Sequence, residues 1–405
     1  MQATAIDILC STASVALVTC TAVAVTVVFT LWSSPRPGPV ESPFPRGRLC
    51  DIGDATAAGE VAKVSDLPDG WWRSDGLLED ERRAIFAGMS IAVSHASMFP
   101  SSGSYRIVEH PAGFPLFLVR GKDRVLRCFH NVCRHRAYPV VSTKRAGCTP
   151  VLACRYHGWT YDLQGHLVKA PKFENVKGFR KEANSLLEVN TAIDADGVVR
   201  INLSLPPESD AYVDDKVFSR GHLESWEVEG TFNWKMAEAE DAFSLPTVSG
   251  KRGNRNITHT KPSVLSDVFA LRHLGSSLLI TVQPKTAAKC VVHCTLYTSA
   301  GLSSATSALL STIQSDIVRC VSSLEDRYAV AQACESSRPT LHDSVFLEKI
   351  KSHRRLERSK GGKVWPSSVG GENHSCRFNI AESLTQELML KATGHEGSGD
   401  GVLSW

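Results

Sequence analysis

The stretch FHNVCRHRAYPV at residues 129–140, followed by LACRYHGWTYDLQG at 152–165, decides how this chain folds. Each segment offers one thiol and one imidazole: Cys133 with His135, and Cys154 with His157. The pattern is Cys-x-His, a gap of 18 residues, and Cys-x-x-His. Thiolates and neutral imidazoles are ligands for transition metals, so the sequence predicts a metal centre held between two loops.

Two kinds of metal centre take two cysteines and two histidines. A [2Fe–2S] cluster can have two thiolates on its inner iron and two imidazoles on its outer iron, which raises its reduction potential. A tetrahedral zinc site is the alternative. The run from Gly158 to Tyr161 favours the cluster, because glycine permits close backbone approach and aromatic side chains can shield a cluster and donate hydrogen bonds to its sulfurs. The aromatic candidates are Tyr156, Trp159 and Tyr161.

Short strands are predicted around this motif. Apolar runs at 105–108, 114–119 and 125–129 are separated by turn residues, a pattern typical of a small β domain. An amphipathic helix is predicted over 77–89, before the first strand. We therefore expect one β-rich domain with an N-terminal helix over residues 66–205.

The second half of the chain has a different pattern. Strand-like runs come first and helical stretches follow, which predicts an α+β domain over residues 220–395. The expected elements are strands at 269–274, 277–284 and 290–299, a helix from 304 to about 334, a basic loop at 349–363 and a last helix near 379–391.

Composition narrows the class of protein only slightly. The chain has 405 residues, 42% hydrophobic and 21% charged, which is ordinary for a packed globular protein. A net charge of +3 is too small to indicate nucleic acid as a partner. The 12 cysteines are scattered, unlike those of a small secreted disulfide scaffold, and favour a reducing compartment.

The N-terminal segment predicts a membrane anchor. Residues 8–32 carry no charge and are numerous enough to cross a bilayer as one helix. A cleaved signal peptide is the alternative, but it needs a positive charge before the apolar run, where the chain has only Asp7. Three arginines follow in a proline-rich linker over 33–65, so we expect a single-pass membrane protein whose body faces the cytosol.

The quoted motif closely resembles the Rieske domain of the Rieske non-heme iron oxygenases, particularly the choline-monooxygenase-like branch. FNWK at 232–235 resembles the signature that opens the catalytic domain of that family. The resemblance implies an α+β fold, in which a Rieske β domain lies beside a helix-grip catalytic domain, typically in homotrimers. It also implies that a separate NAD(P)H-dependent reductase supplies electrons to the cluster. These electrons continue to a mononuclear Fe(2+) in a neighbouring subunit, where O2 is activated.

The region after FNWK departs from the family. The family holds its mononuclear iron with two histidines and one carboxylate. Aligning LPTV at 245–248 with the equivalent turn puts Asp241 at the acid that relays electrons between subunits, and Ser244 and Ser249 at the two histidines. A serine hydroxyl is a neutral, weak ligand and cannot replace imidazole on ferrous iron. Asp326 resembles the third, carboxylate ligand; the alternative for this residue is an exposed acidic helix turn.

Three explanations of this departure stay open. In the first, an exon is missing or misjoined near 236–250. In the second, His259, His273 or His293 supplies a substitute ligand. In the third, the chain is a degenerate paralogue that only delivers electrons. The sequence thus predicts a Rieske-type, monooxygenase-like oxidoreductase acting on a small organic or lipid-like substrate. The alternatives are an electron-transfer or non-catalytic subunit without the second iron and, more distantly, a zinc-stabilised binding module. Because no Gly-rich nucleotide fingerprint is present, the reductant must come from another protein.

Overall fold

The computed structural model describes residues 67–142, 144–206, 211–213, 221–245, 257–271, 275–298, 304–333, 341–365, 380–381 and 383–385. The described residues all belong to one compact unit of the chain, Lys63–Trp405. The predicted anchor at 8–32 and the linker at 33–65 lie outside the described residues. Within the described ranges, no helix is both long and apolar enough to cross a membrane.

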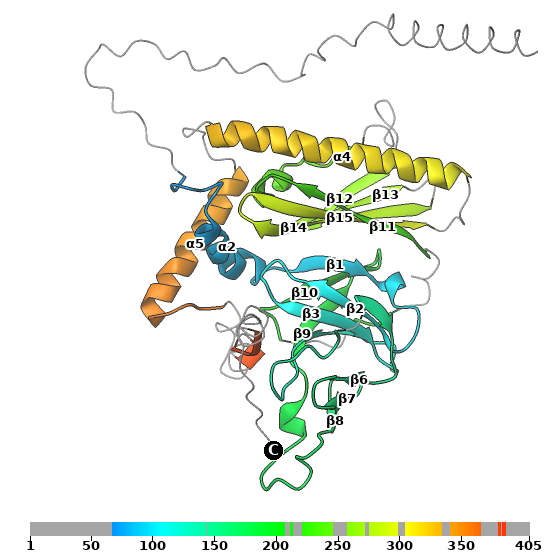
Figure 1. The fold of residues 1–405 in the computed structure, drawn as a ribbon. Coiled ribbons are helices and arrows are strands. Elements are labelled where there is room, and N and C mark those ends of the chain that lie inside the picture. The colour runs from blue at the N-terminus through cyan, green and yellow to red at the C-terminus, as the bar shows by residue number, and fades with distance from the viewer. Residues whose placement is uncertain are drawn as a thin grey trace, which may run out of the picture. The chain divides into compact units, whose positions relative to one another are not determined.

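Two antiparallel sheets form the part of the chain that carries the motif (Figure 1). The seven-stranded sheet has the order β1-β10-β9-β4-β3-β2-β5, and the three-stranded sheet has the order β6-β7-β8. The three predicted strands are confirmed as β2, β3 and β4. The bounds are β1 (Ile91–His95), β2 (Ser104–Glu109), β3 (Pro115–Arg120), β4 (Leu126–His130), β5 (Ala146–Cys148), β6 (Leu152–Ala153), β7 (Thr160–Tyr161), β8 (Leu167–Lys169), β9 (Glu188–Ile193) and β10 (Val198–Asn202).

The seven-stranded sheet separates two hydrophobic cores. Side chains alternate between the two faces of a strand, so neighbouring residues of β3 belong to different cores. Phe117 and Val119 pack in the core that surrounds Cys133 and Cys154. Leu116, Leu118 and their neighbours pack in the larger core on the other face. The motif loops are therefore attached to a sheet that is buried on both faces.

A five-stranded antiparallel sheet forms the second half, in the order β11-β15-β14-β13-β12. The long helix α4 (Ser304–Ala333) lies along one face of it (Figure 1), and Ile313 and Ile317 of the helix share a core with Leu278 and Ile280 of the sheet. This confirms the α+β fold and the helix predicted from 304 to about 334. The strands are β11 (Gly221–Gly230), β12 (Ile257–Ser263), β13 (Ser266–Leu271), β14 (Ser276–Thr286) and β15 (Lys289–Thr298).

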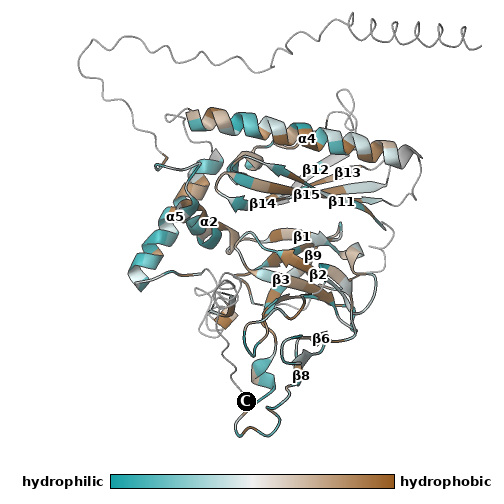
Figure 2. Ribbon diagram, in the orientation of Figure 1, coloured by the Kyte–Doolittle hydropathy of each residue, from teal (hydrophilic) through white to brown (hydrophobic). Residues whose placement is uncertain are grey.

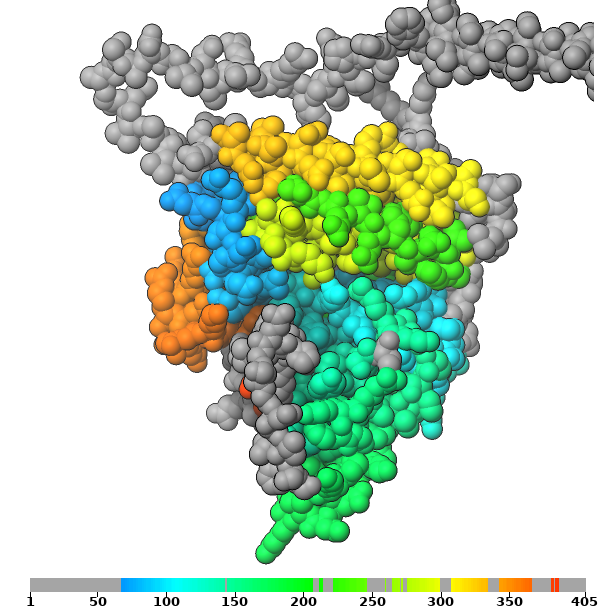
Figure 3. Space-filling model, in the orientation of Figure 1, coloured from blue at the N-terminus to red at the C-terminus, as the bar shows by residue number. Residues whose placement is uncertain are grey.

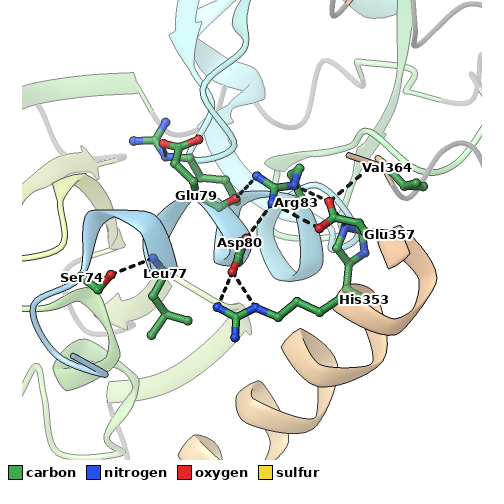
Figure 4. Close-up of polar contacts among 10 residues, drawn as sticks. Ser74, Leu77, Glu79, Asp80, Arg83, His353, Glu357 and Val364 are labelled. Carbon is green, nitrogen blue, oxygen red and sulfur yellow. Dashed lines mark hydrogen bonds and ion pairs between the residues drawn. The ribbon is translucent and has the colours of Figure 1, made fainter. Parts of the chain in front are cut away.

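The predicted N-terminal helix is confirmed as α2 (Asp75–Glu81), which continues as the π-helical segment η1 (Arg82–Phe86). The Oγ of Ser74 accepts a hydrogen bond from the backbone N–H of Leu77 at 3.2 Å (Figure 4). This contact satisfies one of the donors that a helix N-terminus leaves without a partner inside the helix. The helix is thus fixed at its start by a local side-chain cap.

The predicted basic loop at 349–363 is wrong, because most of it belongs to the helix α5 (Leu341–Lys360). Ion pairs with η1 and α2 hold this helix (Figure 4): Arg83 contacts Glu357 at 2.7 Å and Asp80 at 2.6 Å. Arg354 contacts the same Asp80. The polar, charged face of α5 is visible in Figure 2. The many charged residues are typical of a loop, but ion pairs with residues far away in the sequence stabilise this segment as a helix.

The last two residues of the FNWK segment begin the short helix η5 (Trp234–Glu238). This segment forms a buried hub of contacts with α2. Lys235 Nζ donates to Glu81 Oε1 at 2.5 Å, and Trp234 Nε1 donates to Glu81 Oε2 at 2.6 Å. Lys235 Nζ also lies 4.5 Å from the ring centre of Trp71. Asn233 donates to the Ala287 carbonyl at 2.7 Å. The signature residues therefore connect the start of the described chain to the five-stranded sheet.

Two shorter 3-10 turns complete the described backbone: η2 (Ala96–Met98) follows β1, and η3 (Glu182–Asn184) precedes β9. In the space-filling view, the strands of the seven-stranded sheet meet the five-stranded sheet along a seam (Figure 3). Residues 380–381 and 383–385 are helical, which agrees with the last predicted helix; the rest of 379–391 lies outside the described residues.

Candidate iron–sulfur site

The two loops that carry the predicted ligands have the same backbone hydrogen bonds. The N–H of Cys133 donates to the carbonyl of Tyr138 at 2.7 Å, and the N–H of Ala137 donates to the carbonyl of Cys133 at 3.0 Å. In the second loop, the N–H of Cys154 donates to the carbonyl of Trp159 at 2.9 Å. The N–H of Gly158 donates to the carbonyl of Cys154 at 3.0 Å. Each cysteine thus starts a closed turn of equal size.

A left-handed residue closes each turn. Ala137 has φ +52° and Gly158 has φ +73°. Glycine adopts this conformation without cost, whereas an L-residue with a Cβ pays roughly 1–2 kcal/mol. The backbone bonds of the first loop offset this cost at Ala137. The glycine predicted to allow a tight backbone path after the second histidine therefore has that role.

The two thiols lie together at the buried end of the loops. Cys133 and Cys154 are 1% and 3% exposed. A hydrogen bond between their side chains lowers the pKa of Cys154 to about 6 and raises the pKa of Cys133. The backbone N–H groups of Tyr156 and His157 also favour the Cys154 thiolate. One sulfur is thus already stabilised as the anion that binds a metal.

The two imidazoles lie together at the outer end. The ring centres of His135 and His157 are 4.7 Å apart, at an interplanar angle of 72°. His157 is exposed and His135 is half-buried, stacked on Trp159 at 5.0 Å. Partial burial, and then the nearby His157, lower the pKa of His135. Its imidazole is therefore neutral near pH 7, which is the form that binds iron.

Tyr161 connects both loops to one sulfur. Its hydroxyl accepts a hydrogen bond from the backbone N–H of Arg134 at 3.1 Å and lies 3.3 Å from Cys133 Sγ. Since the oxygen already accepts from Arg134, its own proton is directed to the sulfur. Burial raises the pKa of Tyr161, so the phenol keeps that proton. The predicted donor among the three aromatic residues is therefore Tyr161.

The other two aromatic candidates lie differently. Trp159 is buried under His135, so it shields the ligand loops from water. Tyr156 is exposed, with its ring 3.8 Å from the His157 ring and 4.9 Å from that of Tyr138. It borders the imidazole end without covering it. Cys148, between the loops in sequence, is exposed on β5.

The donor set fits a two-iron cluster. Two thiols are paired on the inside and two imidazoles on the outside, as a [2Fe–2S] centre with unlike irons requires. Across the described ranges, no three histidine, cysteine, aspartate or glutamate side chains gather as they do around a single ion. The pairing of two thiols and of two imidazoles fits the cluster, while the four individual ligand assignments stay predictions.

The residues predicted for a mononuclear iron are arranged differently. Asp241 is exposed and forms two contacts with Arg327, at 2.9 Å and 2.5 Å. Ser244 is exposed after η5, and its carbonyl accepts from Cys320 Sγ at 3.1 Å. Asp326 is exposed on α4. These three do not form an iron site among the described residues, and Ser249 lies outside them. Their assigned roles stay predictions.

The possible substitute histidines are engaged elsewhere. His259 Nε2 contacts Asp267 Oδ1 at 2.6 Å, and His293 Nδ1 contacts Glu227 Oε1 at 3.0 Å. Each pair lies on neighbouring strands of the five-stranded sheet. His273 lies outside the described residues. The two described histidines thus each contact a carboxylate on a neighbouring strand.

Sequence reasoning missed two features. Phe173 packs edge-on against His135 and Trp159, at 5.2 Å and 5.3 Å, and so supports the imidazole end. An isolated aromatic residue between Lys172 and Glu174 was the available signal. Asp316 was also missed: it is 2% exposed and is a buried carboxylate on α4, ten residues before the exposed Asp326. Only helix packing distinguishes the two.

Comparison with known proteins agrees with this geometry. The family model of the Rieske [2Fe–2S] domain matches residues 90–180. The carnitine monooxygenase oxygenase subunit of Acinetobacter pittii (strain PHEA-2) is 36% identical over 137 residues, which are 34% of this chain and 36% of that protein. The same subunit of Escherichia coli (strain K12) is 34% identical over 137 residues, with the same shares. The match thus spans about a third of the length of these curated relatives.

A solved structure extends the likeness in fold. The apo crystal structure of the quaternary ammonium Rieske monooxygenase CntA is 22% identical, with a TM-score of 0.52 over 66% of this chain and 84% of that one. Fold and site together define a Rieske iron–sulfur protein with a [2Fe–2S] cluster. The chain thus contains a Rieske [2Fe–2S] domain and is similar, over about a third of its length, to oxygenase subunits of carnitine monooxygenases.

Proposed function

We propose that this chain is the oxygenase component of a Rieske-type monooxygenase system acting on a small organic or lipid-like substrate. The observation that carries the proposal is the paired arrangement of Cys133 with Cys154 and of His135 with His157. A [2Fe–2S] cluster bound there would accept and release single electrons. Support for the reaction type comes from the relatives, whose matched regions belong to oxygenase subunits of carnitine monooxygenases.

The side chains of the ligand loops set the electrostatic environment of that cluster. The hydroxyl of Tyr161 donates a hydrogen bond to the Cys133 sulfur, which stabilises the reduced, more negative state of the cluster. Trp159 and Phe173 keep water from one side of His135. The exposed His157 leaves the imidazole end accessible. We propose that a separate NAD(P)H-dependent reductase docks at this end, because the sequence has no nucleotide fingerprint of its own.

The second iron is the weaker part of the proposal. The family's substrate oxidation needs a mononuclear iron, but Asp241, Ser244 and Asp326 do not form such a site among the described residues. The second candidate is an electron-transfer or non-catalytic subunit that keeps the cluster alone. The likeness to oxygenase subunits favours the first. In the first candidate, Asp241 would relay electrons between subunits of a homotrimer.

Iron and sulfide per chain decide between the two candidates. The full chain, produced with ample iron and sulfide, should contain two sulfides and show a rhombic EPR signal after dithionite reduction. A third iron per chain, together with substrate-dependent NADH oxidation when a reductase is added, supports the oxygenase. Two irons and no substrate oxidation support the electron-transfer subunit. Zinc in place of iron, with no sulfide, would refute both.

We also propose that residues 8–32 anchor the body to a membrane, with 33–65 as a spacer. The support is the uncharged apolar run and the arginines that follow it. After extraction of membranes with alkaline carbonate, the full chain should stay in the membrane pellet, and a variant lacking 8–32 should be released. If the body faces the cytosol, protease added to sealed vesicles from the host should digest it only in vesicles whose cytosolic membrane face points outward.

A further inference from the structure

A partly open cavity lies between the two large sheets, away from the cluster loops. It has a volume of about 270 Å³ and is lined from β1 and β2 on one side and from β11, β14 and β15 on the other. None of the four predicted cluster ligands lines it. Known ligand pockets measure roughly 300–1,000 Å³; this cavity lies just below that range and suits only a small molecule.

The cavity lies on the opposite face of the five-stranded sheet from α4. Residues alternate along β14 and β15: the even-numbered residues, such as Ile280 and Val292, share the core with α4. The odd-numbered residues, such as Thr281, Gln283 and Thr295, line the cavity. A sheet face that only filled a core would carry apolar side chains here. The polar stripe therefore calls for another explanation than packing.

Two arginines and two glutamates line the cavity, and three of these four side chains already have partners. The carboxylate of Glu109 already contacts Lys285 at 2.6 Å and Arg145 at 3.3 Å, and Glu227 contacts His293 at 3.0 Å. These contacts engage both carboxylates that line the cavity. The remaining cation is the guanidinium of Arg106, on β2.

Arg106 has no ion pair or side-chain hydrogen bond with any residue in the described part of the chain. It is half-buried, and burial lowers its pKa. Arg145 and His222, which are cationic or can become so, are close enough to repel it electrostatically. The five N–H donors of this guanidinium therefore have no protein acceptor among the described residues and are available to a ligand.

We propose that this cavity binds a small organic carboxylate, with Arg106 holding the carboxylate group. Guanidinium and carboxylate match in a planar, two-point geometry. The polar side chains Thr281, Gln283 and Thr295 accommodate further oxygen or nitrogen atoms, and Val108 and Leu279 contact the hydrocarbon part. This apolar portion favours a carboxylate with a carbon chain over a bare inorganic anion.

The site differs from the substrate site implied by the proposed function. The turn that carries Asp241 and Ser244 packs against α4, whereas this cavity faces the seven-stranded sheet. A ligand here contacts both halves of the molecule. Binding does not require a second iron or turnover, so it can be tested whether or not the chain is an oxygenase.

Titration calorimetry with hexanoate on the cluster-loaded full chain tests the proposal. We expect a Kd below about 1 mM for hexanoate and no detectable binding of 1-hexanol, which has the chain without the charge. Arg106→Gln should weaken hexanoate binding at least about tenfold, and Arg106→Lys less than that. Arg355→Gln, which removes an exposed cation of α5, is the matched control and should bind as the wild type does.

A second variant guards against a folding defect at Arg106. Thr281→Phe fills the cavity without changing a charge and should also abolish binding, while the reduced EPR spectrum reports an intact cluster domain. The proposal fails if the wild type does not bind hexanoate, or if both Arg106→Gln and Thr281→Phe bind it normally. Equal affinity for inorganic phosphate and hexanoate would overturn the assignment of an organic carboxylate.

Discussion

The cluster loops and the turn after η5 are the two places where the sequence predicts metal ligands, yet their surroundings differ. Around Cys133 and Cys154, paired backbone hydrogen bonds, buried thiols and a stacked tryptophan hold the donor atoms toward one another. Around Asp241 and Ser244 the side chains are exposed, and the one carboxylate is bound to Arg327. Of these two regions, only the cluster loops combine buried ligand residues with further contacts that hold those residues in place.

The sharpest test of this contrast is loss of one thiol. Cys154→Ser should abolish the visible absorption and the reduced EPR signal, because a hydroxyl replaces the thiolate whose pKa is already lowered. Cys148→Ser is the matched control, since that thiol is exposed and outside the loops. A full cluster signal in Cys154→Ser would remove this residue from the ligand set.

The second prediction concerns the hub that joins the two regions. Lys235→Met leaves the Glu81 carboxylate buried without its partner, and breaking such a pair costs about 3–5 kcal/mol in the free energy of unfolding. Burial raises the pKa of Glu81 and lowers that of Lys235, so each charge depends on the other. Urea denaturation measures the loss. A double variant, Lys235→Met with Glu81→Leu, should recover part of it; equal stability of wild type and single variant would contradict the hub.

The sequence predicted the cluster half better than the second half, for physical reasons. The strands around Phe117 and Phe129 have buried faces, so their apolar runs are visible in the sequence. The edge strand β11 reads GHLESWEVEG and is largely exposed, so it lacks that signal. Helix α5 appeared to be a loop because its charges are satisfied by Arg83 and Asp80, more than 270 positions away.

The candidate site divides in the same way. Spacing alone indicated the four cluster ligands and Tyr161, because each loop places its own ligands within a few residues. The contact between Asp241 and Arg327 joins positions 86 apart, and no local pattern reveals it. Which carboxylate of α4 is buried, Asp316 or Asp326, likewise depends on helix packing. Long-range contacts are what a single sequence does not show.

A third prediction uses two buried histidines of the cluster half. Burial lowers the pKa of His110 and of His130 to about 3, below an unfolded value of about 6.5. Both contribute stability above pH 6.5 that is lost as the pH falls toward 3. Unfolding free energy should therefore fall by roughly 2 kcal/mol between pH 6.5 and 5.5. His110→Asn should remove about half of this slope, and His166→Asn, at an exposed histidine, should leave it unchanged.

A fourth prediction measures the hydrogen bond to the sulfur. Tyr161→Phe removes the hydroxyl that lies 3.3 Å from Cys133 Sγ and should lower the reduction potential by about 50 mV. The reduced cluster carries more negative charge on sulfur, so removing the hydrogen bond destabilises the reduced cluster more than the oxidised one. Tyr156→Phe, at an exposed ring, is the control and should not change the potential. Redox titration followed by EPR gives both values, and equal potentials would show that Tyr161 has no effect on the sulfur.

The smallest effect is expected at the turn after η5. Asp241→Asn removes an ion pair whose carboxylate side chain is 60% exposed, so the free energy of unfolding should change by about 0–1 kcal/mol. The hydrogen bonds from Arg327 lower the pKa of Asp241. The pair therefore stabilises the fold at neutral pH and loses its effect as the pH falls below about 3.9, the ordinary value. Salt should reduce the difference between variant and wild type, because exposed charges are screened.

The same variant separates the two regions in function. If Asp241 relays electrons, Asp241→Asn should leave cluster reduction by dithionite unchanged and stop substrate-dependent NADH oxidation. Glu348→Gln, at an exposed carboxylate of α5, should change neither. A loss of several kcal/mol in Asp241→Asn would instead place this turn among the buried, supported regions and break the contrast with the cluster loops. Unfolding and turnover measured on one preparation distinguish these outcomes, because a relay acts on rate and a structural pair acts on stability.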